Sequence, residues 1–502
     1  MKIKSVIQNA SASIIQISVS SLSLIILYRI LIKAIGIEQF GIWSIVLATT
    51  SMAQLASMGI TGSIVNYVAK YSAMDENNKI SLLLETASTS IAIVFIFVLL
   101  IAYPCAKLYL KYALQGDLFQ TALSILPHAL IAYWIAMITS VFQAGLYGFQ
   151  LITYRNYLLM AESVTYLAIC YCIAGTYGLV GLAYARIIQN FISMAVSWII
   201  LKRHIRILPL FPYRWDKTVF REIMGYSINF QIISILAILC DPVTKGLLSR
   251  FGSPSMVGFY EMANRLVQQF RSLIVNANQV LVPAFAQLKE LEPERIRNVY
   301  LKSYQLLFFI SLPVFSALII GAPLISQVWI GRIEETFVAS MIILSVGWFF
   351  NTLSGPAYFA GLGTGELRWN VISHAGMATL NVGLGLILGQ RFGGMGVIVG
   401  WAVALSLSGI ILNISFYKFN QLSMQEFIPS SSRWLTVFCL SGVLLSYIMF
   451  YNASSIFSPI MVSGAMIVFF AGILAGPIWV HPMRKELMEW FSGLRRRNAV
   501  TL

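Results

Sequence analysis

Charge is scarce in this chain of 502 residues. Asp, Glu, Lys and Arg make up 11% of it, whereas an ordinary soluble domain carries about 25%. Hydrophobic residues account for 58%, and the mean hydropathy is +0.79. This balance excludes a soluble globular domain and predicts an all-α protein that crosses a membrane many times.

Cysteine pairs and the usual cofactor motifs are also missing. The five cysteines form no CxxC pair, and the sequence contains neither GxxxxGK[S/T] nor a zinc signature. We therefore expect packing cysteines, no bound metal, no cofactor, and no nucleotide hydrolysis by the chain itself.

What the chain does contain is a long series of apolar segments. A helix of about 20 apolar residues crosses a bilayer, and with that length as the measure fourteen spans are predicted. They are 10–33, 40–67, 81–104, 118–142, 156–175, 178–201, 223–249, 256–286, 303–325, 336–360, 370–389, 393–417, 434–451 and 459–480.

Lys and Arg are distributed unevenly between the two sides of these spans. If the N-terminus lies inside, the inner loops hold roughly three times as many of them as the outer ends. This bias predicts that both termini are cytoplasmic. The net charge of +15 then needs no nucleic-acid partner, because it reflects topology and attraction to anionic inner-leaflet lipid.

Three segments recur at an offset of about 216 residues. IGIEQFGIW (35–43) matches FGSPSMVGFY (251–260), AGLYGFQ (144–150) matches AGLGTGE (360–366), and YGLVGLAYA (177–185) matches FGGMGVIVG (392–400). The repeat predicts two six-helix lobes, related by a pseudo-two-fold axis along the membrane normal, and two further helices. The predicted boundaries are 1–201 for the N-lobe, 202–221 for a basic cytoplasmic linker, 222–417 for the C-lobe, and 418–502 for the last two spans and a basic tail.

Polar residues follow one face of three predicted spans at helical spacing. The first span carries Asn9, Ser13, Gln16, Ser20 and Ser23, with Arg29 near its outer end. The seventh carries Ser227, Gln231, Ser234, Asp241 and Lys245, and the eighth carries Glu261, Arg265, Gln268, Ser272, Asn276 and Gln279. A charge at the bilayer centre costs at least ~2.5–3.5 kcal/mol, so these faces must meet protein or water.

Some of these charges have a purely structural alternative. Asp241–Lys245 and Glu261–Arg265 have the i, i+4 spacing of intrahelical ion pairs. Arg29 and Arg271 have no such partner. Among the other intramembrane groups, we expect Glu162 to pair with Arg186, His128 and His374 to be packed or hydrogen-bonded, and the Gly361/Gly365, Gly396/Gly400 and Gly472/Gly476 pairs to mark close helix contacts.

Longer stretches of the chain resemble a known family. They are IGIEQFGIWSIVLATTSMAQLASMGI from Ile35, DPVTKGLLSRFGSPSMVGFYEMANRLVQ from Asp241, and VLVPAFAQL at 280–288. These resemble polysaccharide (Wzx-type O-antigen) flippases of the multidrug/oligosaccharidyl-lipid/polysaccharide (MOP) superfamily, and the resemblance covers essentially the whole chain. One departure is Pro242, which stands where relatives often carry a basic residue.

The resemblance implies a transporter and not an enzyme. It implies that a polyprenyl-pyrophosphate-linked oligosaccharide moves from the inner to the outer leaflet of the bacterial inner membrane, by alternating access driven by an ion gradient. The implied partners are this glycan lipid, membrane lipid, a proton or sodium ion, and polysaccharide polymerase or assembly proteins.

A cavity lined with cations would replace part of the hydration of a pyrophosphate, and Arg suits phosphate well. We expect this positive field to come from Arg29, Lys33, Lys245, Arg265 and Arg271. Contacts to sugar or water are expected from Gln16, Gln231, Asn276 and Gln279. Asp241 and Glu261 are the candidates for ion coupling.

Two other functions compete with this one. A multidrug or cation antiporter of the same superfamily would favour an acidic, aromatic-lined cavity for cationic drugs. A glycan polymerase or ligase would need a larger outer loop than those predicted near 105–117 and 325–336.

Overall fold

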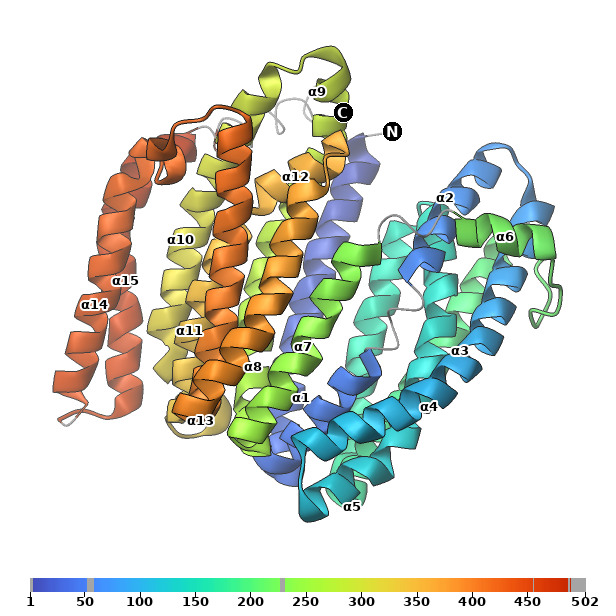
Figure 1. Cartoon of the computed structure of the whole chain (residues 1–502), viewed down its shortest axis with the longest axis horizontal. Coiled ribbons are helices and arrows are strands. Elements are labelled where there is room, and N and C mark those ends of the chain that lie inside the picture. The colour runs from blue at the N-terminus through green and yellow to red at the C-terminus, as the bar shows by residue number, and fades with distance from the viewer. Residues whose placement is uncertain (1–2, 52–57, 226–230, 455, 486–487, 489–502) are drawn as a thin grey trace. The chain divides into compact units, whose positions relative to one another are not determined.

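The computed structural model describes residues 3–51, 58–225, 231–454, 456–485 and 488, and within these ranges the chain contains helices and no strand. The all-α prediction is therefore confirmed (Figure 1). The helices are α1 Ile3–Ser51, α2 Met58–Ala73, α3 Asn77–Ala113, α4 Gly116–Gly148, α5 Ile152–His204, α6 Lys217–Gly225, α7 Gln231–Phe251, α8 Pro254–Asn278, α9 Leu281–Leu291, α10 Arg295–Ile330, α11 Glu335–Leu353, α12 Gly355–Thr364, α13 Arg368–Phe419, α14 Arg433–Ala453 and α15 Pro459–Val480.

The structure contains fewer continuous long helices than the number of spans predicted from the sequence. In the described part of the chain, nine helical segments are long and apolar enough to cross a membrane. Three of them, within α1, α5 and α13, are interrupted by a non-helical glycine near the predicted junction of two spans. The predicted spans 223–249 and 256–286 correspond to α7 and α8, which carry the intramembrane charges and are not among the nine.

By its contacts the chain divides into two compact units. Unit 1 comprises residues 1–261 and 385–397, and unit 2 comprises 262–384 and 398–502. These units are defined by contacts within the chain, whereas the lobe boundaries at 201, 222 and 417 follow the sequence repeat and stay a prediction.

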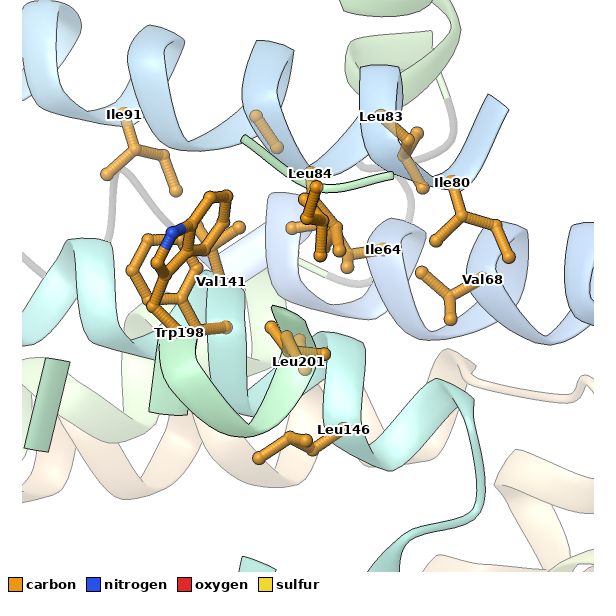
Figure 2. Close-up of a cluster of buried hydrophobic side chains, with 14 of the residues drawn as sticks. Ile64, Val68, Ile80, Leu83, Leu84, Ile91, Val141, Leu146, Trp198 and Leu201 are labelled. Carbon is orange, nitrogen blue, oxygen red and sulfur yellow. The ribbon is translucent and has the colours of Figure 1, made fainter. Parts of the chain in front are cut away.

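The core of unit 1 is formed by α2, α3, α4 and α5. Figure 2 shows Ile64, Leu84, Val141 and Leu201, one from each of these helices, gathered in a single cluster of buried side chains. Lipid tails are as apolar as these side chains, so close packing, more than escape from water, holds such helices together.

In unit 2, α10 packs against α11, α14 and α15. The last two predicted spans are therefore attached to this unit through α10. The GxxxG pair of α15 makes no close helix contact in the described chain, because a Cβ at Gly472 or Gly476 would meet no atom within 4 Å. The prediction of a close contact at this pair is wrong for the isolated chain.

The sequence repeat has a structural counterpart in α5 and α13. Gly178 has φ 54° and ψ −135°, and Gly393 has φ 62° and ψ −151°, a conformation that side chains with a Cβ rarely adopt. Three residues further on, Gly181 faces the carbonyl of Ile173 and Gly396 faces the carbonyl of Leu388, in both cases within its own helix. Equivalent glycines thus make equivalent tight bends.

The first repeated motif brings its two copies into contact with each other. A Cβ placed on Gly41 would lie 1.8 Å from the carbonyl oxygen of Pro254, and one placed on Gly258 would lie 2.8 Å from the carbonyl oxygen of Ile37. Gly41 and Gly258 are matched positions of the repeat, so the contact is reciprocal in the manner of a two-fold interface. All four residues belong to unit 1.

Substituting Gly41 tests this close approach. Gly41→Ala is expected to destabilise the protein by about 1–3 kcal/mol, because the new methyl group overlaps backbone atoms that cannot move aside as a side chain would. The measurement is the thermal midpoint of the detergent-solubilised protein. Gly62→Ala is the matched control, since a Cβ there meets nothing within 4 Å and Ala favours a helix. Equal midpoints for the two variants would contradict the contact.

Candidate functional site

Lys245 of α7 is a buried ammonium group held by two carboxylates. Its Nζ lies 2.8 Å from Oδ2 of Asp241, one helical turn earlier, and 2.9 Å from Oε2 of Glu261 in α8. The side chain of Lys245 is 2% exposed, that of Glu261 6%, and that of Asp241 37%. The predicted Asp241–Lys245 pair is therefore present, and it is joined to α8 by a contact that helical spacing does not predict.

A third element, α1, completes this cluster. Tyr28 donates a hydrogen bond from its hydroxyl to Oε1 of Glu261 at 3.3 Å. The Tyr28 ring is buried and packs edge-on against Phe40, with ring centroids 4.7 Å apart. The cluster thus joins α1, α7 and α8 within unit 1, and removing one partner from such a buried pair costs about 3–5 kcal/mol.

Arg271 of α8 lies in unit 2 and is compensated in a different way. Its guanidinium donates to Oδ1 of Asn351 at 3.0 Å and lies over the ring of Trp348, 4.6 Å from the centroid. Trp348 is itself fixed by a 3.0 Å hydrogen bond from its indole N–H to Oδ1 of Asn264. The described residues place no carboxylate within ion-pair distance of Arg271, and its Nε has no hydrogen-bond partner there.

Tyr358 and His374 lie within electrostatic range of Arg271. Their rings are 5.6 Å apart, and His374 donates from Nδ1 to the carbonyl of Asn370 at 2.9 Å. The hydrogen-bonded role predicted for His374 is confirmed. Arg271 is therefore surrounded by aromatic and amide groups. Such a cation can donate to an anion, and Arg forms short, charge-assisted, bidentate bonds with phosphate.

The remaining predicted site residues fall into two sets. Arg29, Lys33, Arg265, Asn276 and Gln279 are exposed, and Gln279 donates to Asn276 at 3.2 Å. Gln16 is half-buried and donates to Ser20 at 3.1 Å, and Ser20 in turn bonds Ser163 at 2.9 Å. Among the predicted polar faces, the side chains of Asn9, Ser13, Ser227, Gln231 and Ser234 lie outside the described residues. The roles assigned to all of these residues stay predictions.

The predicted pair between Glu162 and Arg186 is wrong. Arg186 does not pair with it at ion-pair distance. Instead, Arg186 stacks on Tyr166 at 4.1 Å and donates to Gln189 at 3.2 Å. Glu162 accepts hydrogen bonds from Gln143, at 2.7 Å, and from Ser193.

Glu162, Gln189 and Ser193 border a small pocket of unit 1. Its lining residues are Leu158, Ala161, Glu162, Thr165, Gln189, Ile192, Ser193 and Val196. The two partners of Glu162 lie on other helical segments, Gln143 on α4 and Ser193 beyond the Gly178 bend of α5, at separations of 19 and 31 residues. Because no helical spacing relates them, the sequence contained no signal for this cluster.

Comparisons with known proteins agree with this fold. A family model described as "Polysaccharide biosynthesis protein" matches residues 26–334. The chain is 22% identical over 417 residues to a Shigella flexneri protein named "Putative O-antigen transporter", which covers 81% of this chain and 97% of the relative. It is 23% identical over 250 residues to the "Amylovoran biosynthesis protein AmsL" of Erwinia amylovora, covering 48% of this chain and 61% of the relative.

Two solved structures show the same fold at low identity. An inward-facing multidrug resistance MATE family transporter of the MOP superfamily gives a TM-score of 0.69 at 14% identity, covering 83% of this chain and 99% of that one. The lipid II flippase MurJ, in an inward closed conformation, gives 0.67 at 12% identity, covering 92% and 98%.

The buried cluster predicts the effect of removing its ammonium group. Lys245→Met leaves Asp241 and Glu261 facing each other without a counter-charge and is expected to cost about 3–5 kcal/mol, measured as thermal stability in detergent. Lys79→Met is the control, because Lys79 and Glu76 form an exposed pair worth at most about 1 kcal/mol. Adding Glu261→Gln to Lys245→Met should restore part of the loss. A Lys245→Met variant as stable as Lys79→Met would show that the cluster has no structural role.

Proposed function

We propose, from the premise that this chain belongs to the polysaccharide biosynthesis protein family, that it flips a polyprenyl-pyrophosphate-linked oligosaccharide from the inner to the outer leaflet of a bacterial inner membrane. The family and the all-α membrane fold predicted from the sequence are confirmed, and the fold is similar to that of a MATE family transporter of the MOP superfamily. In this proposal both termini are cytoplasmic, and polysaccharide polymerase or assembly proteins receive the product.

The observation that carries the proposal is the environment of Arg271. A guanidinium inside a membrane-spanning bundle is costly, and it is normally balanced by an acid or used in function. In the part of the chain that the structure describes, Arg271 has an amide and an aromatic face as partners and no carboxylate. An anionic head group supplies the missing charge, while the polyprenyl tail stays in the bilayer.

The names of the relatives support the same class of substrate. They refer to O-antigen, to amylovoran biosynthesis and to lipid II. Multidrug antiport is the alternative suggested by the MATE structure. The positive charge of Arg271 argues against it, because a cationic drug would be repelled where a phosphate is attracted.

The other predicted cations differ in how readily they can contact the head group. Arg29, Lys33 and Arg265 are exposed and are proposed to extend the positive field. Lys245 is 2% exposed and held by Asp241 and Glu261, so it contacts a phosphate only if these ion pairs open.

Ion coupling is proposed to act on the same two carboxylates. Asp241 is the more accessible of the pair, with 37% of its side chain exposed, and a proton or sodium ion arriving there competes with Lys245. One charge crossing 100 mV supplies about 2.3 kcal/mol, enough to bias an exchange step.

Arg271 is the direct test of the proposed substrate site. Arg271→Ala is expected to lower surface-glycan export at least about tenfold, because a charge-assisted hydrogen bond contributes about 1.5–3 kcal/mol. Arg271→Lys keeps the charge but loses the planar guanidinium, so its export should lie between that of wild type and that of Arg271→Ala. Export is measured by immunoblotting in cells that lack their own flippase, with membrane-inserted protein quantified in parallel.

Arg332→Ala is the matched control for that experiment. Arg332 is an exposed arginine of unit 2 that pairs with Glu334, and its loss should leave export unchanged. Normal export by Arg271→Ala at equal protein level would remove the cationic site from the proposal.

A second prediction concerns coupling. Asp241→Asn should abolish the stimulation of flipping by an imposed pH or sodium gradient while leaving gradient-independent exchange, because the variant carboxamide takes up no proton near neutral pH and carries no negative charge to attract a sodium ion. The measurement is flipping of a fluorescent polyprenyl-pyrophosphate glycan in proteoliposomes. Asp117→Asn, at the exposed start of α4, is the control. A variant still stimulated by either gradient would exclude Asp241 as the coupling group.

A further inference from the structure

The connection between α5 and α6 is folded along the side of unit 1. We call residues 205–216 the strap. Ile205 and Leu208 are each 2% exposed and belong to the hydrophobic core of this unit. Trp198 of α5 donates from its indole N–H to the carbonyl of Leu210 at 2.8 Å. In Figure 1 the strap lies beside α3 and leads into α6.

A buried carboxylate fixes the strap to α3. Glu85 has a side chain that is 0% exposed, and it accepts a 2.9 Å bond from Nε of Arg214 at Oε1. The backbone N–H groups of Tyr213 and Arg214 lie 3.4 and 3.1 Å from Oε2. Arg214 also donates to Ser81 at 2.6 Å. Both oxygens of Glu85 are satisfied, so the position of the strap is built into the fold.

The outer side of the strap is aromatic. From 211 to 216 odd residues are exposed and even residues are half-buried, which is the two-residue alternation of an extended chain. Pro209 and Pro212 favour such an extended backbone. As a result Phe211 and Tyr213, each 73% exposed, and Trp215, 51% exposed, lie on one side.

These rings lie beside a membrane-spanning helix and not beyond its end. The strap contacts α3 from Ser81 to Ser90, where the Trp215 indole N–H donates to Ser90 at 2.9 Å. At 1.5 Å per residue this contact extends roughly 14 Å along α3. Exposed Trp and Tyr at such a position are typical of the belt at the membrane interface.

Unpaired cations flank the aromatic side. They are Arg203, Arg206, Lys217 and Arg221, all exposed and without a carboxylate partner among the residues described. The nearby acids are engaged elsewhere. The pKa of Asp216 lies below its usual value because the Thr218 hydroxyl and the N–H groups that begin α6 bond its carboxylate. Glu222 accepts from Tyr71.

We propose that the strap and α6 form a binding surface for anionic phospholipid. Phe211, Tyr213 and Trp215 enter the interface between head groups, and the flanking cations bind lipid phosphates. The surface is independent of the transported substrate, because it lies outside the residues proposed to contact the glycan lipid. A purely solvated charge run would not display three aromatic rings beside a span.

The depth of the strap is tested with brominated lipid, which quenches tryptophan on contact. Full-length protein is reconstituted in phosphatidylcholine with brominated phosphatidylglycerol, and the signal of Trp215 is obtained as the difference between wild type and Trp215→Phe. Quenching of this difference signal is expected. An unquenched Trp215 would overturn the proposal and would leave a soluble partner as the occupant.

Charge selectivity is tested with two triple variants of equal net charge. Arg206→Gln/Lys217→Gln/Arg221→Gln removes strap cations, whereas Arg297→Gln/Lys302→Gln/Lys418→Gln removes exposed cations of unit 2. We expect the first to lower the preference for phosphatidylglycerol over phosphatidylcholine about tenfold or more, and the second to retain it. Equal losses would mean that net charge alone attracts the lipid, and the proposal would fail.

Glu85→Gln distinguishes a lipid-binding surface that the fold holds in place from attraction by net charge alone. The substitution makes the chain more positive, so net charge alone predicts stronger binding of phosphatidylglycerol. Release of the strap predicts weaker binding, because the cations and rings are no longer held together. An increase in phosphatidylglycerol binding would overturn the proposal. A decrease supports it, provided that the thermal midpoint shows the rest of the protein to be folded as in wild type.

Discussion

A charge inside a membrane-spanning bundle must be met by another group, and this constraint organises the polar interior of the protein. Lys245 satisfies it with two carboxylates from the protein itself, at 2.8 and 2.9 Å. Arg271 satisfies it with an amide and an aromatic face and has no acid at ion-pair distance in the described ranges. The first arrangement balances its charge within the protein, and the second leaves donor capacity for an anionic ligand.

The backbone supports these charges through its glycines. Gly178 and Gly393 allow two long helices to turn between consecutive predicted spans, and Gly41 and Gly258 allow the motifs that follow Tyr28 and precede Glu261 to approach each other. The same contact that joins the two copies of the repeat therefore also holds Tyr28 of α1 and Glu261 of α8 near Lys245. A repeat that first appears as a weak sequence match is part of the support of a charged site.

Hydropathy and spacing predicted much of this fold, because a span of apolar residues and an i, i+4 pair are both local features. The fourteen spans, the glycine repeat and the Asp241–Lys245 pair were accessible in that way. The Lys245–Glu261 contact, the bonds of Glu162 and the Glu85–Arg214 pair were not, because each joins different helices or a helix and a connection. Arg271 was found by the opposite signal, the absence of a partner at helical spacing.

We propose that Arg271 is held ready for the anionic head group of a polyprenyl lipid. It is tested most directly by native mass spectrometry of the purified protein with undecaprenyl pyrophosphate and with uncharged undecaprenol. We expect the pyrophosphate to bind at least about tenfold more tightly, and Arg271→Gln to remove most of this advantage. Equal binding of the two lipids, or an advantage that Arg271→Gln leaves intact, would contradict it.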